Sequence, residues 1–347
     1  MAIYNCHMHI FTTEHVPNKF IPLGLSTAMK WPVLRGLVTF LLDKINPFSN
    51  RDLFHRYSNF IRISYQKTQQ QVFEKVRSYY PLDSKFVVLP MDMAFMDAGK
   101  IPIDIYRQHK ELKELRDKYP DQVIPFIAAD PRRNDVLSMV KELVEKYDFR
   151  GIKIYPPLGY LPDHPKLYQV YEYAQLKNIP IMTHCSRGGV KNKKLPKHLT
   201  TSYADPDNYQ TIMKDFPDLR ICMGHFGGEQ DWDKYLNDPW DNDLPPESKS
   251  WVSKILDMMR SEEFPNLYAD ISYTIFSFQE RVPALKVFLE NPRIADKVLL
   301  GSDFYMVEAE RFRERRLSLN LRAIIGKSLF EKIATENAQK YLGDDKN

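Results

Sequence analysis

The sequence predicts an α/β protein with a (β/α)8 fold, the TIM barrel, and a helical insertion after the first strand. Short apolar runs rich in β-branched residues recur along the 347 residues, and segments of helical period separate them. This alternation is typical of a closed parallel sheet covered by helices. A length of 347 residues and a hydrophobic fraction of 43% suit one barrel domain over residues 1–347. An open doubly wound sheet is the alternative, but no glycine-rich phosphate loop supports it.

The predicted strands are short and almost continuously apolar. Such runs indicate strands that are buried on both faces, as in a parallel sheet between helices or in a closed barrel. In chain order they span residues 3–9, 86–89, 123–127, 151–155, 179–184, 219–225, 267–271 and 298–303.

Several segments between these strands carry one apolar face at helical spacing. The clearest lies between residues 135 and 147, with Asn134 or Asp135 as its N-cap. Similar stripes span residues 167–176, 209–216 and 282–289. In the first of these helices the apolar face consists of Val136, Val140, Leu143, Val144 and Tyr147.

The long segment between the first two strands, about residues 11–81, interrupts this alternation. It contains helical stripes at residues 34–42 and 72–80, with aromatic and basic residues between them. Because it leaves the carboxyl end of the first strand, we expect it to cover the mouth of the barrel, where such folds carry their chemistry. It serves there as additional packing or as a lid over the substrate pocket.

Histidines and an aspartate end several of the predicted strands. His7 and His9 are two residues apart in the first strand, so their imidazoles point to one side at a spacing that suits a single metal ion. Later strands end at or near four more candidate residues, which are Lys153, His184, His225 and Asp303. Because the carboxyl ends of barrel strands meet on one face, we expect these side chains to converge there.

These residues lie in motifs that resemble the metal-dependent amidohydrolase superfamily, and within it the amidohydrolase-2 branch, which also includes decarboxylases. The resemblance covers almost the whole chain apart from the insertion, and its motifs are specific for the superfamily but not for a substrate. A non-catalytic barrel that only binds a ligand is a further alternative, although the expected ligand set is intact. The resembling segments are residues 5–9, 151–157, 181–185, 216–228, 300–305 and 334–343.

The resemblance implies a ligand set for a divalent metal, with zinc favoured. It matches His7, His9 and Asp303 to the ligands of the deeper metal position. It matches His184 and His225 to residues that bind a second metal or act beside a single one.

Lys153 leaves the number of metal ions at one or two. It matches a position that is a carboxylated lysine bridging two metals in dinuclear members. A bare ammonium group cannot bind a cation, so Lys153 is a ligand only if it is carboxylated or deprotonated.

The expected reaction is hydrolysis of a small-molecule amide, lactone or ester. A metal with an open coordination position lowers the pKa of bound water to about 7. Asp303 can accept the proton of that water and pass it to the leaving group, while His225 or His184 stabilises the oxyanion. Non-oxidative decarboxylation of an aromatic or unsaturated acid on the same metal is the alternative, and the sequence does not separate the two.

Residues just beyond the strand ends are candidates for substrate binding. Tyr155 ends the fourth strand, beyond Lys153, Arg187 follows the fifth, and Arg132 and Arg133 follow the third. An arginine there can hold a carboxylate through paired hydrogen bonds, although each position is also compatible with a solvated surface. A basic cluster is either a solvated loop or a means of steering an anionic substrate, and it contains Lys191, Lys193, Lys194, Lys197 and His198.

Composition limits the partners of this protein. A net charge of +4 is small for 49 basic and 45 acidic residues and does not indicate nucleic-acid binding.

The most apolar run, residues 31–45, contains charges and is too short to span a membrane, and no signal peptide is visible. Cys6, Cys185 and Cys222 lie in or at the ends of predicted buried strands, which favours a reducing compartment, the cytoplasm. Barrels of this type commonly associate, so a homo-oligomer is possible.

Overall fold

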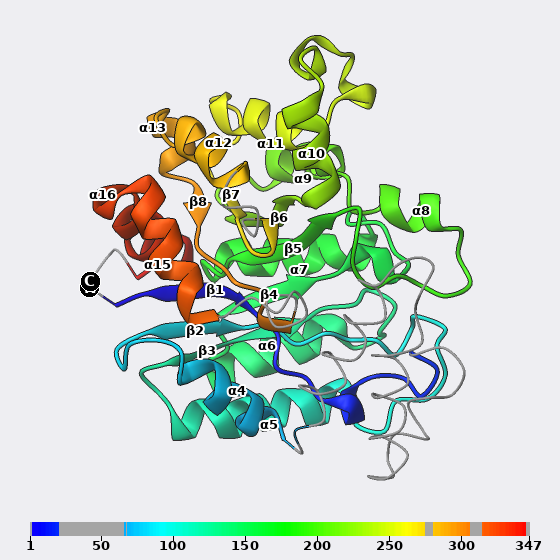
Figure 1. The fold of residues 1–347 in the computed structure, drawn as a ribbon. Helices are drawn as coiled ribbons and strands as arrows, with labels where there is room; N and C mark the ends of the chain where they lie inside the picture. Colours follow the sequence, from blue (N-terminus) through cyan, green and yellow to red (C-terminus); the bar gives the residue numbers. More distant parts are fainter. Residues whose placement is uncertain (1, 21–65, 67, 275–279, 306–313, 345–347) are drawn as a thin grey trace, which may run out of the picture.

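A computed structural model describes residues 2–20, 66, 68–274, 280–305 and 314–344 of the chain. Within them, eight parallel strands follow one another in chain order and curl into a nearly closed barrel (Figure 1). The predicted (β/α)8 fold is therefore confirmed. The strands are β1 (Tyr4–Met8), β2 (Lys85–Val88), β3 (Val123–Ala128), β4 (Gly151–Ile154), β5 (Ile181–Ser186), β6 (Ile221–Gly227), β7 (Leu267–Asp270) and β8 (Val298–Leu299).

Backbone hydrogen bonds bring the first and last strands together. The N–H of Cys6 donates to the carbonyl of Leu300 at 2.8 Å, and the N–H of Asp303 donates to the carbonyl of His7 at 2.9 Å. β8 is shorter than predicted, because the N–H of Leu300 turns instead to the carbonyl of Ile333 in the C-terminal helical region. All eight strands point the same way, so their carboxyl ends meet on one face of the barrel.

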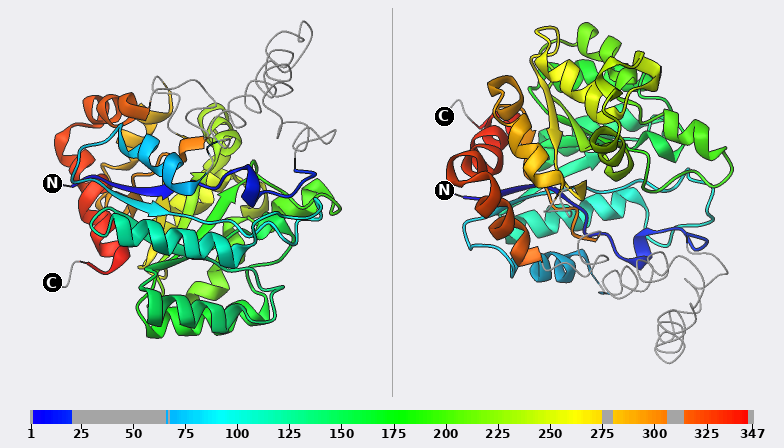
Figure 2. Two further views of the ribbon diagram at one scale, coloured as in Figure 1. Left: turned by 90° about the horizontal axis from the view of Figure 1, so that it is seen from below. Right: turned by 45° about the horizontal axis from the view of Figure 1, so that its top comes forward.

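Helices follow the strands and surround the sheet, as the views in Figure 2 show. The predicted helices at 135–147, 167–176, 209–216 and 282–289 are all present, within about two residues of their expected ends. The helices are α4 (Gln69–Arg77), α5 (Ile105–Lys118), α6 (Val136–Tyr147), α7 (Pro165–Leu176), α8 (Lys197–Ser202), α9 (Gln210–Asp215), α10 (Glu229–Asn237), α11 (Trp251–Arg260), α12 (Arg281–Phe288), α13 (Pro292–Ala295), α15 (Glu314–Ile325), α16 (Lys327–Glu331) and α17 (Asn337–Leu342).

The hydrophobic core has two parts. The larger part packs the helices against the strands. The smaller part contains residues from strands all round the sheet, such as Phe126, Met182 and Leu299, so it fills the barrel interior. Tyr341 of α17 belongs to this smaller part, and the Thr335 hydroxyl just before that helix donates to the carbonyl of Ala2. The C-terminal helices therefore close the end where the strands begin and leave the carboxyl face open for a site.

Only the two ends of the predicted insertion lie among the described residues. Its last helical stripe is α4, which buries Val72, Phe73 and Val76. Residues 21–65, with the stripe at 34–42, lie outside the described residues, so the choice between extra packing and a lid stays a prediction. In the described part of the chain, no helix has the length and apolar character needed to cross a membrane.

Candidate metal centre

The predicted histidines and Asp303 meet at the carboxyl face of the barrel. His7, His225 and Asp303 each offer one ligand atom, and these atoms lie within 4.8 Å of one another. The His9 ring centroid is 5.3 Å from that of His7, and the His184 ring centroid is 4.8 Å from that of His225. Side chains from β1, β5, β6 and the end of β8 thus form one cluster.

His7 is oriented by a buried carboxylate. Its Nδ1 donates to the Oδ2 of Asp270 at 2.8 Å, and both side chains are fully buried. Burial lowers the pKa of His7 well below its usual value, so the imidazole is neutral and its Nε2 carries no proton. Among the residues that the structure describes, this buried Nε2 has no hydrogen-bond partner. A histidine held by a carboxylate on one nitrogen, with the other nitrogen exposed to a central point, is the usual arrangement of a metal ligand.

His9 is held in the same manner by a backbone group. Its Nδ1 donates to the carbonyl of Leu89 at 2.8 Å, and burial lowers its pKa well below the usual value. Its Nε2 is therefore also unprotonated, and the side chain lines the cavity described below.

His184 and His225 face each other through nitrogens that both lack a proton. The Nε2 of His184 lies 3.1 Å from the carbonyl of Gly188, and the Nδ1 of His225 lies 3.3 Å from the carbonyl of Ser272. We assign the ring proton of each histidine to this nitrogen, because a carbonyl can only accept, and the His225 Nδ1 also lies 3.0 Å from the hydroxyl of Ser272, which itself donates to Asp270. The remaining nitrogens, His184 Nδ1 and His225 Nε2, are 3.1 Å apart. Burial lowers the pKa of His225 to about 3 and that of His184 well below its usual value, so no extra proton joins them.

Two lone pairs at this distance repel unless a cation lies beside them. Two nitrogens that bind one tetrahedral zinc ion at about 2.0–2.1 Å are themselves about 3.3 Å apart. The spacing between His184 and His225 therefore fits two neighbouring ligands of one ion. Together with the unpartnered His7 Nε2, this donor set of neutral imidazoles and one carboxylate fits a divalent metal.

Asp303 and Lys153 carry the charges of the centre. Burial raises the pKa of Asp303 to about 7, although the positive charge of Lys153 opposes the shift. Burial lowers the pKa of Lys153 to about 8, against the attraction of Asp270 and Asp303. The Nζ of Lys153 is buried and has no hydrogen-bond partner within the described ranges. Lys153 thus lies among the carboxylates, and its ammonium form, which carries the positive charge, cannot bind a cation.

The backbone is strained where the site forms. His225 and Phe226 have φ values of 69° and 45°, and Asp303 has a φ of 52°. This left-handed conformation of a non-glycine residue raises the free energy of the folded state by about 1–3 kcal/mol, and it is typical of functional positions. Here the Oδ1 of Asp270 accepts the backbone N–H of His225 at 3.2 Å, which holds the strained turn in place.

Asp270 is the functional residue that sequence reasoning missed. Its carboxylate binds both His7 and the backbone of His225, and it accepts the backbone N–H of Ser272 at 3.0 Å. The signal was present, because Asp270 lies near the carboxyl end of the predicted strand 267–271, where the other candidates lie in theirs.

A cavity of about 480 Å³ opens above the metal centre. His9, His184, His225 and Asp303 lie at its base, and Tyr155 lines it as expected. Aromatic rings form much of its wall, and the Phe11 and Tyr305 rings stack at 5.1 Å. Tyr155 stacks on His184 at 4.2 Å, and its hydroxyl accepts the N–H of Val190 at 3.0 Å. The described wall residues besides these are Phe20, Met91, Ser186, Gly188, Gly189, Val190, Lys191, Asn192, Lys193, Leu195, Lys197 and Tyr273.

The structure turns Arg187 away from the position expected of a substrate residue. Its guanidinium binds Asp231 at 2.7 Å and lies over the Trp251 ring, and it is not among the described residues that line the cavity. The charge of Arg187 is thus neutralised by the buried carboxylate of Asp231, which lies 44 residues later in the sequence and so could not be predicted from the residues around Arg187.

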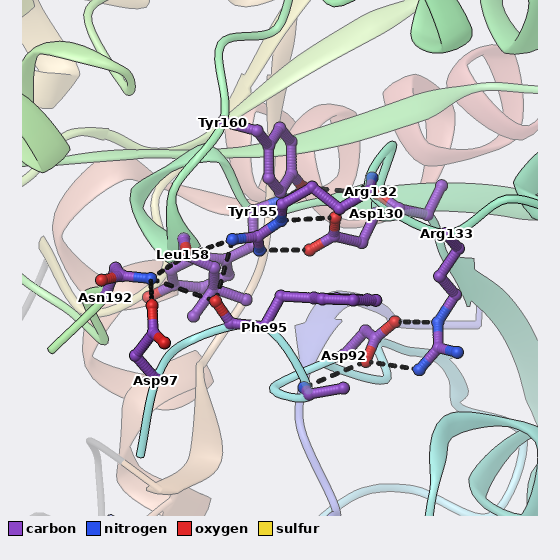
Figure 3. A network of polar contacts seen from close by, with 12 residues as sticks. Asp92, Phe95, Asp97, Asp130, Arg132, Arg133, Tyr155, Leu158, Tyr160 and Asn192 are labelled. Atoms are coloured by element: carbon purple, nitrogen blue, oxygen red, sulfur yellow. Dashed lines mark hydrogen bonds and ion pairs between the residues drawn. The ribbon is translucent and has the colours of Figure 1, made fainter. Parts of the chain in front are cut away.

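Arg132 and Arg133 are committed to ion pairs in the same way, as Figure 3 shows. Arg132 binds Asp130 and the carbonyls of Phe95 and Leu158, and Arg133 binds Asp92. They join the loops beside the cavity and do not line it.

Comparison with known proteins places these features in a family. The sequence model of the family described as amidohydrolase matches residues 4–343. No curated protein matches the chain.

Several solved structures share the fold over essentially the whole chain. A 2,6-dihydroxybenzoate decarboxylase from Rhizobium is 14% identical, with a TM-score of 0.56 and 99% of each chain covered. A dihydroxybenzoic acid decarboxylase from Polaromonas, with bound manganese and 2-nitroresorcinol, is 14% identical, with a TM-score of 0.59 and coverage of 100% of this chain and 98% of that one. A probable 2-pyrone-4,6-dicarboxylic acid hydrolase from Acinetobacter baumannii, with citric acid bound, is 11% identical, with a TM-score of 0.57 and coverage of 99% and 100%. At these identities the likeness shows the barrel fold.

Proposed function

The chain belongs to the amidohydrolase family, and from this premise we propose that it is a metal-dependent hydrolase of a small-molecule amide, lactone or ester. The observation that carries the proposal is the convergence of unprotonated imidazole nitrogens and the Asp303 carboxyl group at the base of one cavity. No Ser-His-Asp arrangement is needed for such a reaction, because a metal replaces the covalent nucleophile.

We assign the metal to His7, His9 and Asp303, with His184 and His225 as the further candidate ligands. When bound, a divalent metal acts as a Lewis acid that polarises a carbonyl and lowers the pKa of water to about 7. Neutral imidazole suits zinc, and a mixed nitrogen and carboxylate set also accepts manganese, the ion found in the Polaromonas decarboxylase. One ion fits the convergent atoms, which belong to His7, His225 and Asp303, and His9 lies beside this group. We assign Lys153 to a place outside the ligand set, because its ammonium group cannot bind a cation.

Asp303 is the residue proposed to move the proton. Its carboxyl group lies at the base of the cavity, where it can accept a proton from water and return it to a leaving group. Lys153 lies close enough to favour the charged form of Asp303.

Tyr155 is the proposed donor to the substrate oxygen. Its hydroxyl accepts the N–H of Val190, so its own hydrogen is available to the cavity, and burial raises its pKa so that it stays protonated. His184 and His225 are less suited to this task than their sequence positions implied, because their N–H groups already donate to backbone carbonyls.

Decarboxylation of an aromatic or unsaturated acid is the second candidate, and the cavity wall favours it specifically. Flat rings from Phe11, Tyr305 and Tyr155 can enclose a planar substrate and exclude water from its carboxylate. Lysines at the rim suit an anionic substrate in either reaction.

One experiment separates these reactions. Purified protein is loaded with zinc or manganese, its metal content is measured, and it is assayed for released carbon dioxide on aromatic acids and for hydrolysis on lactones, esters and amides. Metal-dependent hydrolysis supports the first proposal. Carbon dioxide release without any hydrolysis selects the second, and the absence of both with full metal content would leave a ligand-binding barrel.

We place this enzyme in the cytoplasm, with a small anionic substrate. The thiols of Cys6, Cys185 and Cys222 are free and buried, which suits a reducing compartment. Size-exclusion chromatography coupled to light scattering tests the homo-oligomer that barrels of this type often form.

A further inference from the structure

One wall of the cavity is rich in lysine and poor in acid. The segment that runs from the end of β5 to the start of α8 contributes most of this wall, including Lys191, Lys193 and Lys197. Of the described residues that line the cavity, Asp303 at the metal centre is the only acidic one. The wall therefore presents positive charge that the described residues of the cavity wall do not neutralise.

Hydrogen bonds fix this wall to the rest of the barrel. The buried Asn192 donates through Nδ2 to the carbonyl of Phe95 and to Asp97, both at 3.0 Å (Figure 3). Its Oδ1 accepts the backbone N–H groups of Lys194 and Leu195, at 2.9 and 3.0 Å. The backbone at Lys191 and Lys193, on either side of Asn192, is therefore held in a fixed position.

The same segment touches the metal centre. Gly189 has a φ of +88°, and a Cβ atom at this position would lie 2.7 Å from the Cε1 of His184 and closer still to the Tyr155 hydroxyl. Only glycine permits so close an approach. The lysine wall is therefore held at a fixed place relative to the candidate metal ligands.

Lys191 is a partly buried cation. Its Nζ donates to the hydroxyl of Thr201, and within the described ranges it has no carboxylate at ion-pair distance. Burial lowers its pKa, and the positive charges of Lys197 and Arg187 lower it further. Lys194 in the same segment differs, because it is 77% exposed, pairs with Asp97 at 2.9 Å and does not line the cavity.

The ammonium group of the half-buried Lys191 is repelled by that of the exposed Lys197, and an anion bound beside both offsets that repulsion. Lys193 is less suited to such a role, since its Nζ lies over the Phe20 ring at 5.9 Å. The geometry thus singles out Lys191 and Lys197 as the pair that faces a ligand.

We propose that Lys191 and Lys197 form a second anion-binding site in the cavity, so that the substrate is a planar molecule with two anionic groups, one at the metal centre and the other, a carboxylate or a phosphate, at these lysines. This inference rests on the proposed function and names its substrate class. It differs from electrostatic steering, in which lysines speed the approach of any anion but do not contact it in the complex.

Binding of defined probes to metal-loaded protein tests the proposal. Benzoate supplies one carboxylate. Hydrolysis of an amide, lactone or ester produces such a group, and decarboxylation consumes one, so benzoate is a suitable probe for either reaction. Benzene-1,3-dicarboxylate and 3-carboxyphenyl phosphate add the second anion in its two forms. Titration calorimetry measures the dissociation constants for wild type, Lys191→Met, Lys197→Met and the matched control Lys194→Met.

We expect at least one dianion to bind about ten-fold or more tightly than benzoate, since hydrogen bonds to charged groups contribute that much. Lys191→Met and Lys197→Met should each remove most of this gain, while Lys194→Met should retain it. The dianion with the larger gain identifies a carboxylate or a phosphate as the second group.

The opposite results contradict the proposal. One is equal affinity for benzoate and both dianions. Another is a higher affinity for a dianion that remains in both Lys191→Met and Lys197→Met. The third is an equal loss of dianion affinity in Lys194→Met, which would indicate an effect of general surface charge. Metal-dependent benzoate binding without a dianion gain rejects the second site and keeps the proposed function. If benzoate binding does not depend on metal, the proposed function itself fails, and the inference with it.

Discussion

Replacing Asp270 by asparagine tests the architecture of the metal centre without removing a ligand. The carboxylate binds the Nδ1 of His7 at 2.8 Å, and neither side chain is exposed to solvent, so water cannot take over this role. An asparagine at this position either accepts the same hydrogen bond without charge or turns its NH2 group toward Nδ1. In the second case His7 carries its proton on Nε2, and that nitrogen can no longer bind a metal.

The loss of such a carboxylate lowers metal affinity by about 10–100-fold, or roughly 1.4–2.7 kcal/mol. We expect Asp270→Asn to fall in this range, because the same carboxylate also holds the strained backbone of His225. Competition with a chromogenic chelator at fixed pH measures the dissociation constant of the metal.

Asp241→Asn is the matched control for this substitution. Asp241 is equally buried and accepts hydrogen bonds from Ser250 and Ser253, but it lies outside the cavity and the metal centre. It should lower thermal stability and leave metal affinity unchanged. Wild-type metal affinity in Asp270→Asn, or an equal loss in Asp241→Asn, would refute the assigned role of Asp270.

Four further substitutions test separate parts of the structure. Asp303→Asn should keep the circular dichroism spectrum and lower turnover at least about 100-fold, since an amide cannot accept the proton; near-normal turnover would overturn its role. Lys153→Ala should leave the metal content per chain unchanged, since an ammonium group cannot bind a cation, and a reduced content by elemental analysis would make the lysine a ligand. Gly189→Ala should weaken benzoate binding, because its Cβ would collide with the Tyr155 hydroxyl and the His184 ring; wild-type binding would contradict the close approach. In protein stripped of metal with a chelator, His109→Gln should reduce the loss of thermal stability that occurs as the pH falls from about 6.5 to about 3. Burial lowers the pKa of His109 to about 3, so the unfolded chain binds a proton at this histidine more readily than the folded chain. The free energy of unfolding therefore decreases by at most about 1.4 kcal/mol for each unit by which the pH falls in this range. An unchanged pH dependence in His109→Gln would refute this.

The fold and the positions of the ligands could be predicted because both follow from local patterns. Short apolar runs mark the strands, and in a parallel barrel every strand end lies on one face. His184 and His225, which are 41 residues apart, therefore meet at 3.1 Å from their places at the ends of β5 and β6.

The direction of long side chains could not be predicted, because it depends on partners from distant loops. Arg187 follows β5 at the mouth of the barrel, yet Asp231, 44 residues later, draws its guanidinium away from the cavity. Lys191 lies four residues beyond Arg187 and keeps no such partner among the described residues, so it faces the cavity. Sequence position places both at the rim, and only the pairing in three dimensions separates them.

The most direct test of the metal centre is anomalous diffraction from crystals loaded with zinc or manganese. The account predicts one anomalous peak at the base of the cavity, within bonding distance of the Nε2 of His7 and the carboxylate of Asp303. A fully loaded crystal with no peak there, or with its peak away from these side chains, would contradict it.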